Sequence, residues 1–310
     1  MPGEAKMFAD TKKLLLKAQQ GKYAIAHFNI NNLEIVQGVV QAAMKLKAPI
    51  ILATSEGALK YAGMNYLYAL AKIASEQANV PLALHLDHGK DLDLIKQAIQ
   101  KGYSSVMIDA SHQKFEKNIT LTKHVVALAH KKGISVEAEL GTIGGAEDLV
   151  SSRNIIYTDP EKAKEFVDRT GCDFLAVAIG TSHGAYKFKS HANLQLGILG
   201  QIQSKVKIPL VLHGASGVPS ALVSVAQKYG ADLSGVKGVP DSQIKKAIMG
   251  GITKINTDTD LRIAFDAAVR KALHTKPAEF DPRHMLAPAR DLIQKVAEQR
   301  IRLFGSIGKG

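Results

Sequence analysis

Three of the eleven histidines in this 310-residue chain, His88, His183 and His213, are each followed directly by glycine. Imidazole nitrogens are common zinc ligands, and three that leave one coordination position open form a typical catalytic site. A following glycine keeps side chains away, so that a substrate can approach the backbone. If their segments end at one edge of a sheet, the three residues are predicted to bind a catalytic Zn²⁺. The other histidines, His27 and His85 among them, are interpreted as supporting or surface groups.

Carboxylates accompany these histidines. Asp87 precedes His88 and is predicted to act as an acid or base beside the metal. Asp109 and Glu139 lie at the ends of neighbouring apolar segments, where they could hold a displaced or second metal ion, and Glu137 shares the face of Glu139 as a supporting group. Glu147 lies in a long polar segment, and the residues alone leave open whether it is brought in by closure or is solvated.

The elements that must position these groups are eight short apolar segments alternating with amphipathic ones. The apolar segments are Tyr23–Asn29, Pro49–Thr54, Leu82–Leu86, Ser104–Asp109, Ser135–Leu140, Phe174–Ile179, Pro209–Leu212 and Lys254–Asn256. The predicted helices between and after them are Asn32–Lys45, Met64–Gln77, Leu92–Lys101, Lys117–Lys131, Glu161–Arg169, Ala221–Tyr229, Asp260–Ala272 and Pro288–Leu303.

Eight strand and helix units predict an α/β fold, a (β/α)₈ TIM barrel forming a single domain over residues 1–310. Residues 1–20 are predicted to form an additional N-terminal helix that covers the barrel bottom, and the tail adds C-terminal helices. An open doubly wound sheet is the second choice, because no Gly-x-Gly-x-x-Gly pattern follows the first strand. Residues 141–160 are expected to form a lid or an irregular loop, and residues 231–242 a surface excursion.

Every predicted strand ends in polar residues, and catalytic groups of such barrels lie at these ends. Glycine and hydroxyl residues after the sixth, seventh and eighth strands can present backbone N–H groups to an anion, which predicts a phosphate cradle. Its residues are Gly184, Gly214, Ala215, Ser216, Asn256, Thr257, Asp258 and Thr259.

Composition narrows the class of protein. The net charge is +12, yet the lysines are scattered, tryptophan is absent and aromatic residues make up 5%, which argues against nucleic-acid binding and favours an anionic small substrate. No apolar run predicts a membrane span. Cys172 is the sole cysteine and is interpreted as structural, which fits a reducing cytoplasm.

These motifs together resemble one family along essentially the whole chain. The matching stretches are Phe28-Asn29, Ser55-Glu56-Gly57-Ala58, LHLDHG, SVMIDASH, VEAELG, AIGTSHGAYK, PLVLHGAS, KINTDTDLRIAF and FDPR. The chain is similar to class II, zinc-dependent fructose-1,6-bisphosphate aldolases of the shorter bacterial type. The resemblance implies reversible cleavage of fructose 1,6-bisphosphate to dihydroxyacetone phosphate and glyceraldehyde 3-phosphate, in glycolysis and gluconeogenesis.

The resemblance also implies a role for each site residue. It places Zn²⁺ on His88, His183 and His213, a second or inactive metal site on Asp109 and Glu139, and proton exchange with the C4 hydroxyl on Asp87. Glu147 matches the mobile-loop carboxylate that moves the proton at the dihydroxyacetone phosphate carbon, and Ala146 stands where longer relatives carry a second carboxylate.

The remaining implied contacts concern the substrate and the assembly. The cradle residues match the dihydroxyacetone phosphate contacts, and Asn29 and Ser55 match further polar positions of the pocket. Arg283 matches an arginine that holds the second phosphate in a neighbouring subunit's site, which implies a homodimer or homotetramer. A bound monovalent cation, K⁺ or Na⁺, is left open.

Three alternatives stay open from the sequence. The first is tagatose-1,6-bisphosphate as the substrate, which differs at one stereocentre. The second is a lysine Schiff base, although Lys254 begins the eighth segment, far from its carboxyl end. The third is an inactive barrel used as a binding protein, which should lack a ligand or carboxylate, and none is missing.

Overall fold

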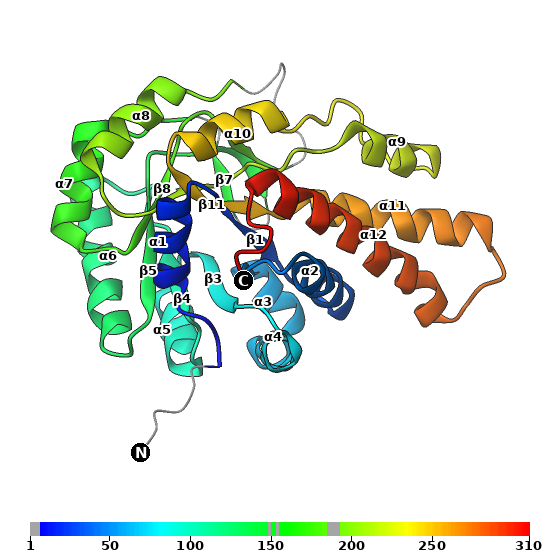
Figure 1. Ribbon diagram of the computed structural model, residues 1–310. Helices are drawn as coiled ribbons and strands as arrows, with labels where there is room; N and C mark the ends of the chain where they lie inside the picture. The colour runs from blue at the N-terminus through cyan, green and yellow to red at the C-terminus, as the bar shows by residue number, and fades with distance from the viewer. Residues whose placement is uncertain (1–6, 148–149, 153–154, 185–192) are drawn as a thin grey trace.

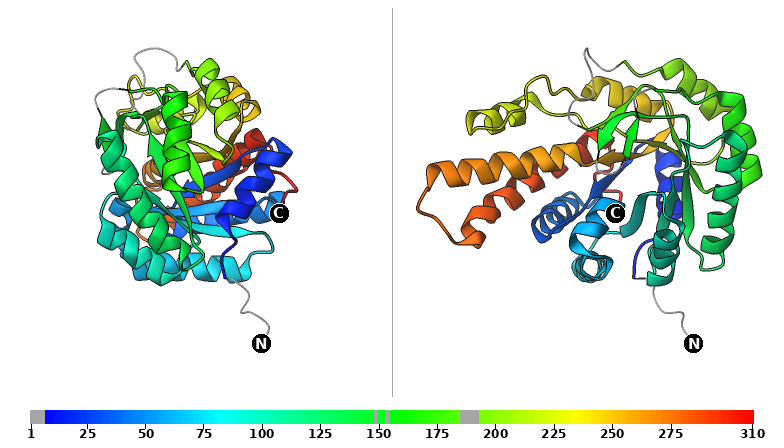
Figure 2. Two further views of the ribbon diagram at one scale, coloured as in Figure 1. Left: turned by 90° about the vertical axis from the view of Figure 1, so that its left-hand side faces the viewer. Right: turned by 180° about the vertical axis from the view of Figure 1, so that it is seen from behind.

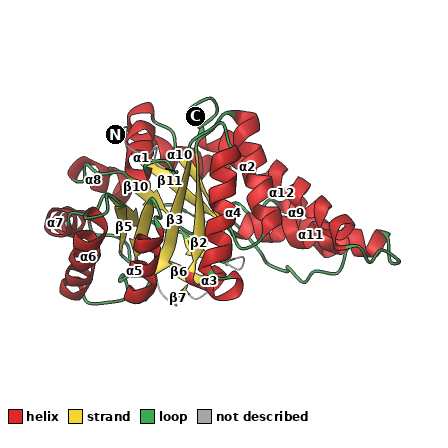
Figure 3. Ribbon diagram, turned by 90° about the horizontal axis from the view of Figure 1, so that it is seen from below, coloured by secondary structure: helices red, strands yellow, loops and turns green. Residues whose placement is uncertain are grey.

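Eight parallel strands form a closed barrel in the computed structural model. The structure describes residues 7–147, 150–152, 155–184 and 193–310. At residues 146–147 and 150–152 it describes the backbone alone. Each strand coincides with one predicted apolar segment, so the predicted (β/α)₈ barrel is confirmed (Figures 1 and 3). The barrel strands are β1 (Ile25–Asn29), β2 (Ile50–Ser55), β3 (Leu82–Gly89), β4 (Ser105–Ile108), β5 (Ser135–Leu140), β8 (Phe174–Val177), β10 (Leu210–Leu212) and β11 (Ile252–Thr257).

Helices surround the strands on the outside of the barrel (Figure 3). Those expected from the sequence are α2 (Leu33–Leu46), α4 (Met64–Gln77), α5 (Leu92–Lys101), α6 (Phe115–His130), α7 (Pro160–Thr170), α9 (Ser220–Lys228), α11 (Thr259–Thr275) and α12 (Pro282–Phe304). Three more, which the hydrophobic periodicity did not indicate, are α3 (Glu56–Ala62), α8 (Leu196–Lys205) and α10 (Asp241–Met249). Gly197 and Gly200 weaken the helix signal of α8, whereas burial of Leu199 and Ile202 stabilises it in the fold.

Helix α12 begins earlier than the sequence indicated. It starts at Pro282 rather than Pro288, because the Asp281 side chain accepts a hydrogen bond from the backbone N of Arg283 and a proline is well suited to the first helical turn. Together with α11 it forms a hairpin that projects away from the barrel (Figures 1 and 2).

The amino-terminal helix α1 (Thr11–Gly21) closes the barrel bottom, as predicted. Asp10 caps it by accepting a hydrogen bond from the backbone N of Lys13. Its buried face packs into the lower barrel interior, and that apolar cluster comprises Leu14, Leu15, Ala18, Tyr23, Ile25, Ile51, Ala83, Phe174, Ala176 and Val211.

Above this apolar layer the barrel interior becomes polar. Because side chains two residues apart on a strand share a face, each strand can supply one group to each layer. The buried middle layer contains His27, His85, Glu137 and Lys254, each two residues before an upper-layer group. The upper layer contains Asn29, Asp87, Glu139 and Asn256, so the chemistry is concentrated at the carboxyl end of the strands.

A small second sheet lies over that end and replaces the irregular loop expected at residues 141–160. In it, β6 (Gly144–Glu147) pairs with β7 (Val150–Ser152) and with β9 (Ser182–His183). A Cβ at Gly145, whose φ is +86°, would lie 2.3 Å from the carbonyl oxygen of His183. The glycines that suggested an irregular loop instead allow this close strand pairing.

Cys172 is buried, and burial raises the pKa of its thiol to about 12. The thiol is therefore protonated near neutral pH, in agreement with its predicted structural role. A search of the helices in the described ranges finds none that could serve as a membrane span.

Candidate active site

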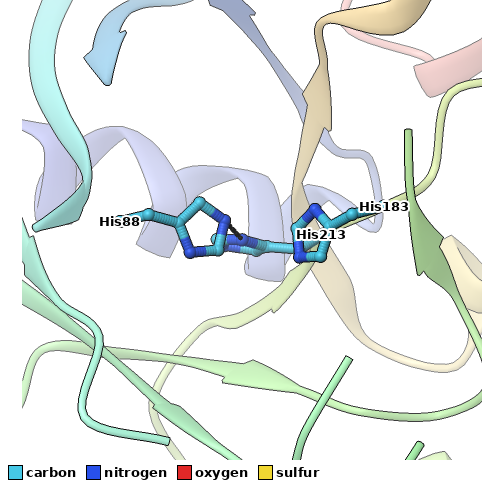
Figure 4. Close-up of side chains that lie close together, drawn as sticks. All are labelled: His88, His183 and His213. Carbon is cyan, nitrogen blue, oxygen red and sulfur yellow. Dashed lines mark hydrogen bonds between the residues drawn. The ribbon is translucent and has the colours of Figure 1, made fainter. Parts of the chain in front are cut away.

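His88, His183 and His213 come together at the carboxyl end of the barrel, as the sequence predicted. His88 lies on β3, His183 on β9 and His213 directly after β10, and all three are buried. Their nearest ring nitrogens lie within 4.8 Å of one another, and Nδ1 of His213 is 2.7 Å from Nε2 of His88 (Figure 4). Three imidazoles at this spacing can ligate one metal ion.

The backbone and charge of His88 are both unusual. Its φ is +48°, a conformation that non-glycine residues rarely adopt and that often marks functional positions. Its Nδ1 lies 3.0 Å from Oδ2 of Asp109, whose other oxygen accepts hydrogen bonds from Ser111. Burial lowers the pKa of His88, but Asp87, Asp109 and Glu139 outweigh burial and raise it to about 10. The pocket thus favours a positive charge, which a metal ion can supply in place of the proton.

Glu139 supports the same conclusion. Its Oε2 is buried without a hydrogen-bond partner and lies 3.9 Å from Nδ1 of His213. Burial, followed by the charge of Asp109, raises the pKa of Glu139 well above its usual range. His88, Asp109 and Glu139 also have ligand atoms within 4.8 Å of one another. A buried carboxylate oxygen without a hydrogen-bond partner beside imidazoles fits a divalent cation, and the second group of ligand atoms fits a second position.

Asp87 is held by two amides. Asn29 Nδ2 donates to Oδ2 of Asp87 at 2.9 Å, and Asn256 Nδ2 donates to Oδ1 at 3.0 Å. Although burial opposes ionisation, the surrounding cationic groups, led by His88, hold the pKa of Asp87 well below its usual range. Asp87 is therefore an oriented, ionised carboxylate, able to accept a proton beside the histidines.

A buried ion pair supports His213 from below. Oε1 of Glu137 lies 2.6 Å from Nε2 of His213, and Oε2 lies 2.9 Å from Nζ of Lys254. An Nε2–H bonded to Glu137 leaves Nδ1 of His213 as the nitrogen that can ligate a metal. Lys254 also donates to Oδ1 of Asn256 at 2.8 Å, so its ammonium group is fully engaged.

His27 and His85 belong to the same buried layer, rather than to the surface. With Asp87 they form a third group whose ligand atoms lie within 4.8 Å of one another. Burial, and then the charge of Lys254, lowers the pKa of both rings well below the usual range. The positive charge of Lys254 opposes a cation here, so the metal position next to His88, His183 and His213 is favoured.

The predicted cradle segments also converge. A Cβ at Gly214, whose φ is +59°, would lie 2.6 Å from the carbonyl oxygen of Ser182, so the two loops are in close contact. Thr257 ends β11, and Thr259 begins α11. A helix amino terminus favours anions, and the buried hydroxyl of Thr257 has no hydrogen-bond partner.

Three other predicted site residues differ in their placement. Ser55 is aligned with Asp87 across β2 and β3, and it caps α3 by accepting a hydrogen bond from the backbone N of Ala58. The backbone of Glu147 ends β6, but its side chain lies outside the described residues. Arg283 is exposed on the projecting hairpin, where it pairs with Asp281. The structure therefore does not bring Arg283 to the site of its own chain.

Comparison with known proteins agrees with this arrangement. The family model described as "Fructose-bisphosphate aldolase class-II" matches residues 9–309. A fructose-bisphosphate aldolase of Giardia intestinalis is 48% identical over 96% of this chain and 93% of its own length. One of Thermus caldophilus is 48% identical over 96% and 98% of the two chains. Among solved structures, the YdjI aldolase from Escherichia coli K12 superimposes with a TM-score of 0.79 at 35% identity, over 97% of this chain and 99% of that one.

Proposed function

The chain belongs to the class-II fructose-bisphosphate aldolase family, and from this we propose that it is a lyase that reversibly cleaves fructose 1,6-bisphosphate. The products are dihydroxyacetone phosphate and glyceraldehyde 3-phosphate, the step used in glycolysis and gluconeogenesis. The observation that carries the proposal is the position of the three histidines beside the oriented carboxylate of Asp87. We also propose that residues 1–310 form a single catalytic domain and that the enzyme works in the cytoplasm.

The metal is proposed to be Zn²⁺, because three nitrogen donors suit zinc better than Mg²⁺ or Ca²⁺. His88, His183 and His213 would hold it, and Asp109 and Glu139 would serve a second or displaced position. When bound, the ion supplies Lewis-acid polarisation of the substrate carbonyl. Glu137 keeps the Nδ1 side of His213 directed toward the site.

Asp87 is proposed to take the C4 hydroxyl proton during cleavage and to return it during condensation. The bonds from Asn29 and Asn256 fix both of its oxygens, so its lone pairs are held in one orientation. Glu147 is proposed to protonate the carbon of dihydroxyacetone phosphate from β6, the strand paired with that of His183. Asn29 and Ser55 line the pocket.

The two phosphates are proposed to bind at different places. The phosphate of the dihydroxyacetone half would bind to the cradle. The cradle comprises Gly184, Gly214, Ala215, Ser216, Asn256, Thr257, Asp258 and Thr259. Arg283 would bind the other phosphate in the active site of a neighbouring subunit, because its projecting hairpin carries it away from its own barrel. This requires a homodimer or homotetramer.

The other functions considered are less well supported. The relatives from Giardia intestinalis and Thermus caldophilus are named fructose-bisphosphate aldolases, which favours fructose over tagatose. A Schiff base at Lys254 is disfavoured because its buried ammonium is paired with Glu137 and bonded to Asn256. An inactive barrel is disfavoured because the three histidines lie close to Asp87, Asp109 and Glu139.

The purified protein is expected to cleave fructose 1,6-bisphosphate faster than tagatose 1,6-bisphosphate, and EDTA is expected to abolish the reaction until Zn²⁺ is added. Because the pKa of His88 is raised to about 10, protons compete with the metal, and the Kd of the site for Zn²⁺ should be higher at pH 6 than at pH 8. A coupled assay of triose phosphate formation measures the cleavage, and a zinc titration at the two pH values measures the Kd. Activity that survives exhaustive chelation, or covalent trapping by borohydride, would contradict the metal-based proposal.

An Arg283→Met variant is expected to lose affinity for fructose 1,6-bisphosphate, because one phosphate loses its partner. Mixing it with Asp87→Ala under subunit exchange should restore about a quarter of the unmodified activity, since hybrid dimers contain one complete site. Steady-state kinetics and analytical ultracentrifugation provide the measurements. A fully active monomer, or no recovery on mixing, would show that Arg283 does not act across an interface.

A further inference from the structure

A buried ion pair connects helix α12 with the turn that follows the Gly214–Ser216 loop. Arg300 of α12 is 5% exposed and Asp260 in the first turn of α11 is 0% exposed, and Nε of Arg300 lies 3.0 Å from Oδ2 of Asp260. The carboxylate of Asp260 also accepts hydrogen bonds from two backbone N–H groups, those of Gly217 at 3.2 Å and Val218 at 2.7 Å. One side chain therefore joins α12, α11 and this turn.

The turn adopts a conformation that needs support. Val218 has a φ of +46°, which is an outlier for a β-branched residue. Such a conformation persists only where the surrounding structure imposes it. The 2.7 Å hydrogen bond from the N–H of Val218 to Asp260 is a contact of that kind, and it is charge-assisted.

Two groups lie directly against the turn. A Cβ at Gly217 would lie 2.5 Å from Nη2 of Arg300, so the guanidinium group lies directly against the Gly217 backbone. A Cβ at Gly238 would lie 2.2 Å from the carbonyl oxygen of Gly217, and the backbone N of Val239 donates to the carbonyl oxygen of Ser216 at 3.1 Å. The ion pair and its hydrogen bonds are therefore one support of the turn, and the neighbouring backbone is another.

Asp260 occupies a special place in the chain because it follows Thr259, which ends one half of the proposed phosphate cradle. Its carboxylate binds the turn that follows Ser216, which ends the other half. Asp260 thus links the two halves, and Arg300 is paired with Asp260. Nη1 of Arg300 is itself held at 3.0 Å by Asp241 of α10.

We propose that Arg300 and Asp260 are positioning residues that hold the two halves of the cradle at the separation that the substrate phosphate requires. The inference rests on the proposed function, because it presupposes that the cradle binds the phosphate of dihydroxyacetone phosphate. Neither residue touches the substrate. They act through the backbone of Gly217 and Val218.

The test uses the full-length, zinc-loaded protein with Arg300→Met. The Kd for dihydroxyacetone phosphate and the KM for fructose 1,6-bisphosphate are expected to rise about 10- to 100-fold, because the buried carboxylate of Asp260 loses its ion-pair partner. The kcat and the zinc content should stay near the unmodified values. Arg302→Met is the matched control, since Arg302 is exposed two residues further along the same helix.

A second substitution separates positioning from general stability. Val218→Gly in the Arg300→Met protein is expected to restore part of the affinity, because glycine adopts a positive φ without strain. Arg300→Lys, which keeps the charge and loses the planar fork, should show a smaller rise in Kd. If Arg300→Met does not fold, Arg300→Lys decides the question in its place.

The outcomes are distinguishable. Folded Arg300→Met or Arg300→Lys with an unchanged Kd for dihydroxyacetone phosphate would overturn this inference alone, and so would a loss of kcat and zinc without a change in Kd. If the unmodified protein does not bind dihydroxyacetone phosphate, the proposed function fails and takes this inference with it.

Discussion

Asp87→Ala is expected to lower kcat for cleavage by about 10²- to 10⁴-fold, the range typical for a positioned general base. The side chain that accepts the C4 proton is lost, and the amides of Asn29 and Asn256 lose their shared acceptor. His88 and His213 are held by Asp109 and Glu137, respectively, so the zinc content should remain that of the unmodified protein. Steady-state kinetics with metal analysis measures both quantities.

Asp93→Ala is a suitable control for this experiment. Asp93 is an exposed acidic residue in the first turn of α5, close in sequence but on the surface. Its replacement should leave kcat unchanged. If Asp87→Ala loses zinc together with activity, Asp87 serves the metal site and its role as a proton acceptor is wrong.

His183→Ala is expected to remove both metal and activity while the barrel remains folded. Loss of a direct ligand should weaken zinc binding by more than the roughly 100-fold that loss of a supporting hydrogen-bond partner can produce. The barrel should persist because His183 lies on the short β9 strand, outside the closed ring of eight strands. Zinc titration, activity and circular dichroism provide the three readouts.

His124→Ala is the matched control, because His124 is exposed on α6. It should keep zinc, activity and the circular dichroism spectrum. Turnover retained by His183→Ala would refute the assignment of this residue as a ligand.

Much of the barrel could be predicted from the sequence, because its strands are apolar and end in polar residues. That pattern alone places His88, His213 and Asp87 at one end of the barrel. The convergence of His183 with them depended on the same pattern. The roles of all these residues in catalysis stay predictions until the variants are measured.

The buried middle layer was less well anticipated. His27 and His85 were interpreted as supporting or surface groups, and Lys254 as remote from the site, yet all three are fully buried in the barrel. The sequence did contain a signal for their burial. Each of the three lies two residues before an upper-layer group on the same strand, so its side chain also faces the barrel interior. What the pattern could not supply is the pairing between strands, such as Glu137 with both His213 and Lys254, since this depends on barrel closure.

Contacts between residues far apart in the sequence were the least predictable part of the structure. The pairing of β6 with β9 joins residues far apart in the chain, and local composition does not encode such a pairing. The ion pair of Arg300 and Asp260 is long-range in the same sense. Neither residue stands out in the sequence, because an arginine in a terminal helix is usually solvent-exposed.

The layered barrel interior has a consequence for how this enzyme can evolve. The apolar layer sealed by α1 supplies cohesion, whereas the upper layers bury charges that contribute little to folding. Stability and catalysis therefore reside at opposite ends of the same strands. Substitutions that adapt the enzyme to heat can accumulate at the closed end without altering the chemistry at the open end.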